Sequence, residues 1–179
     1  MTAVDRPIKI LISEDEIAKR VEELAGIINS DYLGKSVKVI CVLSGGVIFM
    51  SDLIKCLDLD IKIDFISVSS YGSDTKSSGN VKITRDIRDP IEGEHVLLVE
   101  DIVDSGLSLY YLKNYLLSQN PESFKVCTLL DKPQRRENDV APDYIGFTIP
   151  NEFVIGYGLD YNQYYRNLPY VGILPEELI

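Results

Sequence analysis

The chain has 179 residues, of which 45% are hydrophobic and 26% are charged, and 28 acidic residues against 18 basic ones give a formal net charge of -10. This composition predicts one globular domain with a substantial core and excludes disorder as the main state of the chain. The acidic balance disfavours general affinity for nucleic acid or anionic lipid, because both attract clustered Lys and Arg.

The termini and the cysteines indicate where the protein resides. Residues 1–7 lack the basic start and the apolar centre of a signal peptide, and no run of 18 apolar residues occurs. The cysteines Cys41, Cys56 and Cys127 show no C-x-x-C spacing, so neither a disulfide framework nor a zinc site is expected. Cys41 and Cys127 lie in apolar runs and are expected to be buried free thiols. We therefore expect a cytoplasmic protein with no membrane partner.

The first third of the chain alternates between predicted helices and strands. Ser13 and Glu16 form a capping box, and apolar residues at helical spacing follow, so a helix is expected to begin near Ser13. A buried strand is predicted over 37–43. The sequence Ser44-Gly45-Gly46 ends this strand, and a second helix is predicted over 47–57.

A polar stretch follows the next predicted element, a strand over 61–68. Residues 69–84 are polar and glycine-bearing, and only 81–84 are strand-like. A polar segment of this length inside a compact domain is unusual unless it forms a functional flap or a solvated hairpin. Composition alone leaves both possibilities open.

The rest of the chain continues the alternation. Residues 96–99 form the clearest buried strand and 107–117 the helix after it, and further strands are predicted over 124–130, 144–149, 153–156 and 170–174. This order predicts an α/β fold: a mostly parallel, twisted sheet with helices on both faces, in a single domain over 1–179. Such sheets bind ligands at the carboxyl ends of their strands.

Several common nucleotide and hydrolase motifs are absent from the sequence. There is no G-x-x-x-x-G-K-[ST] phosphate loop, and Gly156-Tyr157-Gly158 lacks the third glycine of the dinucleotide fingerprint. Gly106-Leu107-Ser108 begins like a nucleophile elbow, but no histidine follows it. The only histidine, His95, precedes the strand over 96–99, at the end opposite the expected site, so we interpret it as structural.

One segment concentrates residues suited to chemistry. The apolar strand over 96–99 is followed by Glu100 and Asp101, then by Asp104 and by the loop Ser105–Ser108, which opens a helix. Free amides at a helix N-terminus favour a phosphate, and acidic side chains suit sugar hydroxyls or hydrated Mg2+. The segment therefore predicts a ribose-phosphate clamp. In the alternative interpretation, Asp104 and Ser105 merely cap the helix and the two acids are solvated.

At residues 96–108 the sequence resembles the type I phosphoribosyltransferases. Their signature is four apolar residues, two acids, two apolar residues, Asp, Ser or Thr, Gly, any residue, and Ser or Thr. Further segments resemble bacterial hypoxanthine-guanine phosphoribosyltransferases in order and spacing, and together they cover most of residues 10–174. These segments are 43–46, 69–72, 128–133 with Arg135-Arg136, and 149–161 with Arg166.

The resemblance implies a purine-salvage enzyme. Its reaction would transfer 5-phosphoribose from 5-phosphoribosyl 1-pyrophosphate to hypoxanthine or guanine, with Mg2+, and release pyrophosphate. It further implies the type I fold with a small hood built partly from 145–179, a flexible loop over about 69–84, and assembly as a homodimer or homotetramer. Whether hypoxanthine, guanine or xanthine is preferred stays open.

The resemblance also implies roles for individual residues at positions that match the family. Glu100 and Asp101 would hold the ribose hydroxyls and the metal, and Asp104 would accept the purine proton. The 5'-phosphate would be cradled by Ser105, Gly106, Leu107, Ser108 and Leu109. The purine would be bound by Lys132, Phe153, Val154 and Asp160, and Asp160 would also hold a second Mg2+. Pyrophosphate would be bound by Ser44, Gly45, Ser70, Tyr71 and Arg166, with Ser70 and Tyr71 in a lid.

The residue chemistry agrees with three of these roles. Lys132 after an apolar strand can donate to a carbonyl oxygen of an oxopurine, although a loop lysine is often simply solvated. Phe153 suits stacking on a base, although composition alone favours a core position. Arg166 suits phosphate oxygens or a surface acid.

The segment at Ser44 and Gly45 departs from many relatives in one residue and leaves one backbone feature open. Ser44 stands where they carry Lys or Arg, so only a backbone contact to pyrophosphate is expected there. Family members often hold the Ser44–Gly45 peptide in the cis form, and the sequence leaves its state open.

Two alternative functions remain. A nucleotide-binding and RNA-binding regulator of the same fold would need a basic face. The densest basic cluster is Lys132, Arg135 and Arg136, in a chain of net charge -10, and this disfavours the regulator. A xanthine-preferring or adenine-type transferase is the alternative within the enzyme class.

Overall fold

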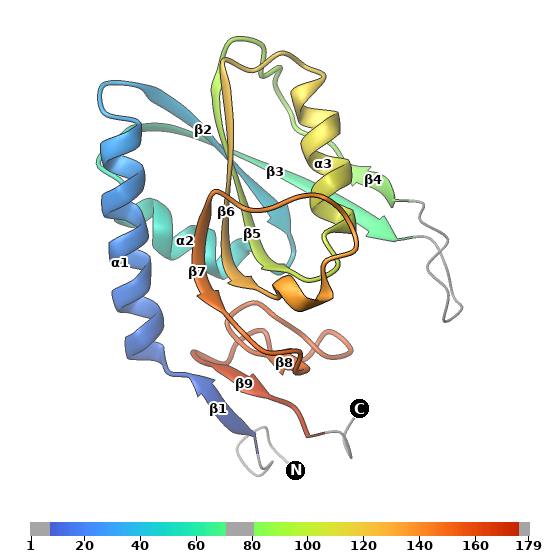
Figure 1. Ribbon diagram of the computed structural model, residues 1–179. Helices are drawn as coiled ribbons and strands as arrows, with labels where there is room; N and C mark the ends of the chain where they lie inside the picture. The colour runs from blue at the N-terminus through green and yellow to red at the C-terminus, as the bar shows by residue number, and fades with distance from the viewer. Residues whose placement is uncertain (1–7, 71–80, 176–179) are drawn as a thin grey trace.

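The computed structural model describes residues 8–70 and 81–175. Its centre is a six-stranded sheet in the order β4-β3-β2-β5-β6-β7, in which β4 alone runs antiparallel to its neighbour (Figure 1). The strands are β2 (Ser36–Leu43), β3 (Asp60–Ser70), β4 (Val81–Arg85), β5 (His95–Val103), β6 (Ser123–Asp131) and β7 (Tyr144–Thr148). The predicted mostly parallel sheet is confirmed.

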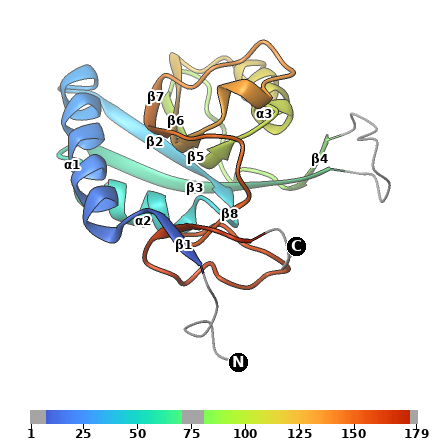
Figure 2. The same ribbon diagram turned by 60° about the horizontal axis from the view of Figure 1, so that its bottom comes forward.

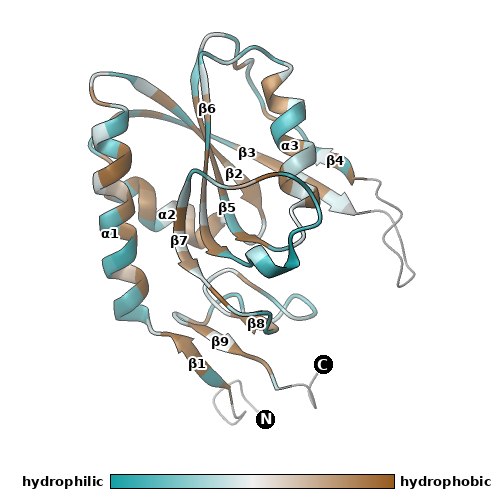
Figure 3. Ribbon diagram, viewed as in Figure 1, coloured by the Kyte–Doolittle hydropathy of each residue, from teal (hydrophilic) through white to brown (hydrophobic). Residues whose placement is uncertain are grey.

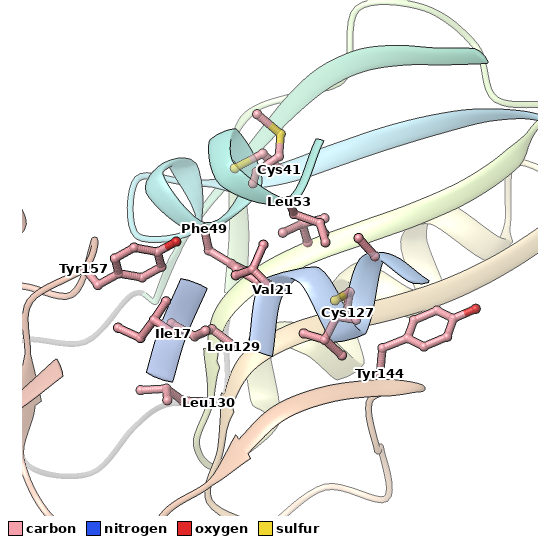
Figure 4. Close-up of a cluster of buried hydrophobic side chains, with 14 of the residues drawn as sticks. Ile17, Val21, Cys41, Phe49, Leu53, Cys127, Leu129, Leu130, Tyr144 and Tyr157 are labelled. Carbon is pink, nitrogen blue, oxygen red and sulfur yellow. The ribbon is translucent and has the colours of Figure 1, made fainter. Parts of the chain in front are cut away.

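Helices cover both faces of this sheet, as predicted. On one face α1 (Glu14–Asp31) and α2 (Val47–Lys55) pack against alternate residues of β2 and β5. Figure 4 shows part of this core, where Ile17 and Val21 of α1 meet Phe49 of α2 and Leu129 of β6. On the other face α3 (Leu107–Leu117) packs against the remaining alternate residues.

The capping box predicted for the first helix is present. The Glu16 backbone amide donates to the Ser13 hydroxyl at 3.3 Å, and the Ser13 amide donates to the Glu16 carboxylate at 2.8 Å. Hydrogen bonds to Ser13 lower the pKa of the Glu16 carboxyl. The helix therefore begins at Glu14, directly after its cap.

A second, three-stranded sheet forms the hood that the resemblance implied. Strand β9 (Val171–Ile173) lies between β1 (Lys9–Ile12) and β8 (Val154–Ile155), antiparallel to both. Figures 1 and 2 show this sheet at the end of the large sheet where β2 and β5 terminate. The hood therefore faces the carboxyl ends of the parallel strands.

Several predicted boundaries need correction. The strand expected over 96–99 runs on to Val103, because Glu100, Ile102 and Val103 pair with β6. The second helix ends at Lys55 rather than at 57. Strand β1 was not predicted; it exists because β9, far away in the sequence, pairs with it. A short 3-10 helix, η2 (Pro133–Arg135), was also missed.

The polar stretch over 69–84 begins and ends in paired strands. Residues 69 and 70 of β3 pair with 82 and 81 of β4. Tyr71 and the rest of 71–80 lie outside the described residues, so the choice between flap and hairpin, and the predicted lid, stay predictions.

The far end of the sheet contains the single histidine. The Nδ1 atom of His95 lies 2.8 Å from the Ser123 hydroxyl, and the His95 ring meets the edge of Tyr32. Cys41 and Cys127 are buried free thiols, as predicted, and Cys56 is exposed. Among the described residues, no helix combines the length and the apolarity needed to cross a membrane.

Candidate functional site

The carboxyl ends of three parallel strands bring the predicted site residues together. Strands β2, β5 and β6 run side by side in the same direction. The segment after each strand is polar or glycine-rich: Ser44–Gly46, Asp104–Gly106 and Lys132–Arg135. Figure 3 shows hydrophilic colours on the segment after β6 and hydrophobic colours within the strands. Contacts link these segments to one another and to the hood, because Gly158 approaches Gly45 and Nζ of Lys132 lies 3.6 Å from Oδ2 of Asp104.

Glu100 and Asp101 lie within the carboxyl-terminal part of β5. Glu100 is buried, and its Oε2 atom has no hydrogen-bond partner in the part of the chain that the structure describes. Burial raises the pKa of the Glu100 carboxyl well above its usual value, and the neighbouring Asp101 charge adds to this. Burial also raises the pKa of Asp101 to about 6. The two acids are therefore not solvated loop residues, and helix capping does not explain them.

Gly45 makes room for the Asp101 carboxylate. A Cβ atom added to Gly45 would lie 1.6 Å from Oδ2 of Asp101, and one added to Gly158 would lie 2.1 Å from the carbonyl oxygen of Gly45. The loop after β2 is thus held between the acid of β5 and the hood. The cis peptide in this loop is Leu43–Ser44, one bond before the candidate that the family resemblance suggested.

A cavity of about 270 Å3 connects the acids with the start of α3. Residues 100–109 line it, which includes every residue assigned to the ribose and its phosphate. Gly106 has φ of 82°, a left-handed conformation that favours glycine, and directly precedes the helix. The Leu107 amide donates to the Ser105 hydroxyl at 3.4 Å. The cavity thus has carboxylates at one end and a helix N-terminus, which favours anions, at the other.

Asp104 is surrounded by cationic side chains. Nε of Arg135 donates to Oδ1 of Asp104 at 2.9 Å, and Nζ of Lys132 lies 3.6 Å from Oδ2. Arg136 donates to the Asp104 carbonyl oxygen at 3.2 Å and also pairs with the buried Asp131. The Asp104 side chain remains 41% exposed, so the carboxylate is accessible from the cavity side.

Lys132 and Phe153 lie where the hood approaches β6. Lys132 is buried, and its ammonium donates to the Glu152 carbonyl oxygen at 2.8 Å, so it is not a solvated loop lysine. Phe153 is 41% exposed and meets Tyr161 edge-to-face at 5.7 Å, so it is not an ordinary core residue. Val154, the next residue, is buried in β8. The Lys132 ammonium therefore contacts the backbone of Glu152, the residue directly before the exposed Phe153.

Asp160 and Arg166 form an ion pair on the hood. Nη2 of Arg166 lies 2.9 Å from Oδ1 of Asp160, and Nη1 donates to the Gly158 carbonyl oxygen at 2.7 Å. The Gln163 amide donates to Oδ2 of Asp160 at 2.8 Å. The positive charge of Arg166 lowers the pKa of Asp101, and the negative charge of Asp160 raises it. The ion pair on the hood therefore lies close to the acids of β5.

The acids fit a hard divalent cation. Mg2+ takes oxygen ligands, is typically held by one or two carboxylates, and keeps several waters. The Oε2 atom of Glu100, for which the described residues supply no hydrogen-bond partner, and the neighbouring Asp101 carboxylate offer such ligands. A bound cation would give the buried Glu100 oxygen a partner. Within residues 8–70 and 81–175, no cluster of three or more His, Cys, Asp or Glu is assembled.

The structure also places residues here that sequence reasoning had not assigned. Arg135 contacts Asp104, Arg136 contacts both Asp104 and Asp131, and the carbonyl oxygen of Glu152 holds Lys132. The family resemblance includes these adjacent arginines but implies no role for them. Ser44 is exposed and carries no charge to this site.

Comparisons with known proteins identify the family to which the chain is similar. Residues 10–162 match the family described as phosphoribosyl transferase domain. The hypoxanthine-guanine phosphoribosyltransferase of Streptococcus thermophilus is 48% identical over 170 residues, which are 95% of this chain and 94% of that protein. A crystal structure of a hypoxanthine-guanine phosphoribosyltransferase from Bacillus anthracis is 47% identical, covers 93% of this chain and 98% of its own, and gives a TM-score of 0.90.

A longer relative contains the same region. The bifunctional protein TilS/HprT of Listeria monocytogenes is 49% identical over 170 residues, or 95% of this chain. The match covers 26% of that protein, so the chain spans about a quarter of the length of this relative.

Proposed function

The chain belongs to the phosphoribosyl transferase family, and we propose that it is a hypoxanthine-guanine phosphoribosyltransferase of purine salvage. The reaction transfers 5-phosphoribose from 5-phosphoribosyl 1-pyrophosphate to the purine and releases pyrophosphate. The proposal draws on the similarity to enzymes of that name over most of the chain. It also draws on a cavity that joins buried acids to a helix N-terminus.

The phosphoribosyl group fits the cavity lined by residues 100–109. The amides and hydroxyls of Ser105–Ser108 offer donors to the 5'-phosphate at the start of α3, where the helix dipole favours an anion. The acids Glu100 and Asp101, at the other end, face the ribose hydroxyls. This polarity orients the sugar with its anomeric carbon away from the phosphate loop.

Metal ligands are available at two places. Glu100 with Asp101, and Asp160 on the hood, would hold Mg2+, which neutralises charge on the pyrophosphate leaving group when it is bound. Arg166 and the backbone of Ser44 and Gly45 supply further donors to the same group. Because Ser44 brings no positive charge, Arg166 carries that role among the assigned side chains.

The purine is held between the hood and β6. The Lys132 ammonium donates to the six-position oxygen of an oxopurine, and Phe153 packs on the face of the base. An adenine amino group in that position gives the lysine no acceptor, which disfavours adenine. The Asp104 carboxylate, 3.6 Å from the same lysine, accepts the proton that the base loses.

The basic side chains here are already engaged. Arg135 pairs with Asp104, and Arg136 pairs with Asp131. These pairs leave little positive charge for RNA phosphates, which supports an enzyme over an RNA-binding regulator. We further propose that the enzyme is a cytoplasmic homodimer or homotetramer, as the family resemblance implies.

The observation that carries the proposal is the buried Oε2 atom of Glu100, which lines this cavity and has no hydrogen-bond partner among the described residues. A buried acid oxygen without a partner costs stability unless a ligand completes it. The test is a panel of hypoxanthine, guanine, xanthine and adenine with 5-phosphoribosyl 1-pyrophosphate and Mg2+, following nucleotide formation. We expect IMP and GMP. Formation of AMP alone, or of no nucleotide, would contradict the proposal.

A further inference from the structure

The hood loop that carries Asp160 is fastened to the β2–α2 unit at two points. The first is the close approach of Gly158 to the Gly45 carbonyl oxygen, where an added Cβ atom would lie 2.1 Å away. The second lies one residue earlier, at Tyr157. Its hydroxyl donates to Oδ2 of Asp52 on α2 at 2.6 Å, across 105 residues of sequence.

Tyr157 is rigidly held in its own loop. It is 6% exposed and packs in the core beside Phe49 of α2, as Figure 4 shows. Its backbone has φ of 49°, which is uncommon for a residue other than glycine, and its amide donates to the Leu168 carbonyl oxygen at 2.8 Å. The side chain is therefore a fixed link between hood and helix.

On the β2–α2 side, both points of attachment lie in the segment from Ser44 to Asp52, which begins with the loop proposed to bind pyrophosphate. Helix α2 starts at Val47, directly after Ser44–Gly46, and Asp52 lies on this helix. On the hood side, Gly158 accepts a hydrogen bond from Arg166 through its carbonyl oxygen and donates its amide to the Arg166 carbonyl oxygen. The link therefore connects the Ser44–Gly45 backbone with the Arg166 side chain.

We propose that Tyr157 and Asp52 are positioning residues for the pyrophosphate end of 5-phosphoribosyl 1-pyrophosphate. Their hydrogen bond sets the distance between the hood, which carries Asp160 and Arg166, and the loop at Ser44–Gly45. This inference rests on the proposed function. Neither residue is assigned to the substrate. Of the proposed purine contacts, Lys132 follows β6, and the backbone of Phe153 is held by β9, because the Leu174 amide donates to the Phe153 carbonyl oxygen at 3.0 Å and Val154 pairs with Ile173. These contacts are separate from the Tyr157–Asp52 hydrogen bond.

The surroundings of the pair make it suited to a clean test. Asp52 and Tyr157 both line a cavity of about 470 Å3 between α1, α2 and the hood. The Asp52 side chain is 40% exposed and is also paired with Lys55 at 2.7 Å. Asp52 therefore keeps a partner and access to water when the tyrosine hydroxyl is removed, and Tyr157→Phe is expected to fold.

The chain contains a matched control for this variant. Tyr144 is 6% exposed, and its hydroxyl donates to Oδ2 of Asp31 at 2.6 Å, while Asp31 pairs with Lys125 at 2.8 Å. The residue types, the hydrogen-bond distance and the burial repeat those at Tyr157. Tyr144 lies at the start of β7, whereas the site lies at the carboxyl ends of the strands.

The experiment compares Tyr157→Phe and Tyr144→Phe with the unmodified enzyme. One hydrogen bond to a charged group corresponds to roughly a tenfold effect on an equilibrium. We expect the KM for 5-phosphoribosyl 1-pyrophosphate, and its dissociation constant by calorimetry with Mg2+, to rise roughly 3- to 10-fold in Tyr157→Phe only. The KM for hypoxanthine should stay unchanged, and both variants should lose similar thermal stability.

Three outcomes separate the possibilities. An unmodified enzyme without transferase activity would overturn the proposed function itself. An active enzyme in which both variants bind 5-phosphoribosyl 1-pyrophosphate alike would overturn the positioning role alone. A Tyr157→Phe variant that loses affinity for hypoxanthine to the same extent would also overturn it, because that pattern indicates that the whole site has become less ordered.

Substitutions of Asp52 test the other end of the hydrogen bond. Asp52→Asn retains an acceptor for the Tyr157 hydroxyl, so it should preserve most of the affinity for 5-phosphoribosyl 1-pyrophosphate, whereas Asp52→Ala should reproduce Tyr157→Phe.

Discussion

The Nε atom of Arg135 lies 2.9 Å from Oδ1 of Asp104, so the carboxylate proposed to accept the purine proton is already paired with a cation. Lys132 lies 3.6 Å from the other carboxylate oxygen. Both Arg135 and Asp104 are partly exposed, with side-chain accessibilities of 48% and 41%. Exposed ion pairs contribute only about 0–1 kcal/mol, so a substrate can replace the arginine at little cost.

Replacing Asp104 by Asn tests the proton acceptor. The amide keeps the shape of the side chain but cannot take a proton, so turnover should fall by about 10²- to 10⁴-fold. The phosphate loop at Ser105–Ser108 is unchanged, so the dissociation constant of GMP, measured by calorimetry, should move little. Unchanged turnover would remove Asp104 from this role.

Replacing Arg135 by Gln separates the ion pair from the chemistry. Because the pair is exposed, we expect kcat/KM for hypoxanthine to change less than about fivefold, far less than in Asp104→Asn. Steady-state kinetics of both variants under the same conditions give the comparison. A loss through Arg135→Gln as large as that through Asp104→Asn would mean that the arginine itself is needed for the reaction.

Replacing Lys132 by Ala tests recognition of the base. The buried ammonium is held by the Glu152 carbonyl oxygen, and hydrogen bonds to charged groups are worth about 1.5–3 kcal/mol. We therefore expect kcat/KM for hypoxanthine and guanine to fall by about 10- to 100-fold. The KM for 5-phosphoribosyl 1-pyrophosphate serves as the internal control and should hold. Retained discrimination between oxopurines and adenine would contradict the assignment.

Replacing Glu100 by Gln should have opposite effects on stability and on activity. In the metal-free protein the Oε2 atom of Glu100 is buried and has no hydrogen-bond partner within residues 8–70 and 81–175, and burial raises the pKa of this carboxyl well above the usual value. Removing the ionisable group should raise the unfolding free energy at pH 8 by about 1–3 kcal/mol. Thermal unfolding with and without Mg2+ measures this.

Addition of Mg2+ with 5-phosphoribosyl 1-pyrophosphate should stabilise the unmodified enzyme more than Glu100→Gln, because the amide is a weaker ligand. Activity of the variant should fall at the same time. Equal stabilisation of both proteins by the metal and substrate would show that Glu100 is not a ligand.

The local parts of the site were predictable because they follow from neighbouring residues. The site pattern is contained in one short segment: an apolar strand runs into Glu100 and Asp101, and a glycine loop then opens a helix. The structure forms a cavity from these consecutive residues. The alternation of strands and helices likewise predicted the parallel sheet. The extent of β5 was underestimated, because pairing with β6 continues through two charged residues that propensity alone would place in a loop.

Contacts between distant segments were beyond sequence reasoning. Strand β1 exists through its pairing with β9. The contact of Arg135 with Asp104 depends on a short 3-10 helix after β6, and the exposure of Phe153 depends on the path of the hood. In each case the decisive partner lies more than 20 residues away or in an irregular segment, where periodicity carries no signal.

The buried pair of Lys38 and Asp64 gives the fold a measurable acid sensitivity. Asp64 is 5% exposed, and its carboxylate accepts from the amides of Phe65 at 2.8 Å and Arg88 at 2.9 Å. Burial by itself raises the pKa of this carboxyl, but these amides and the Lys38 ammonium at 3.5 Å outweigh it, so the pKa lies below the usual 3.8.

A carboxyl with a lowered pKa in the folded state stabilises the fold above its unfolded pKa and loses this contribution as the pH falls through the folded value. Asp64→Asn should cost about 3 kcal/mol at pH 7, because it leaves Lys38 buried without its carboxylate. The difference from the unmodified protein should shrink below about pH 4. Denaturant unfolding between pH 7 and pH 3 measures it, and Asp60→Asn, at the exposed start of the same strand, is the control. A stability difference that stays constant down to pH 3 would mean that the amides and Lys38 do not favour the ionised form of Asp64.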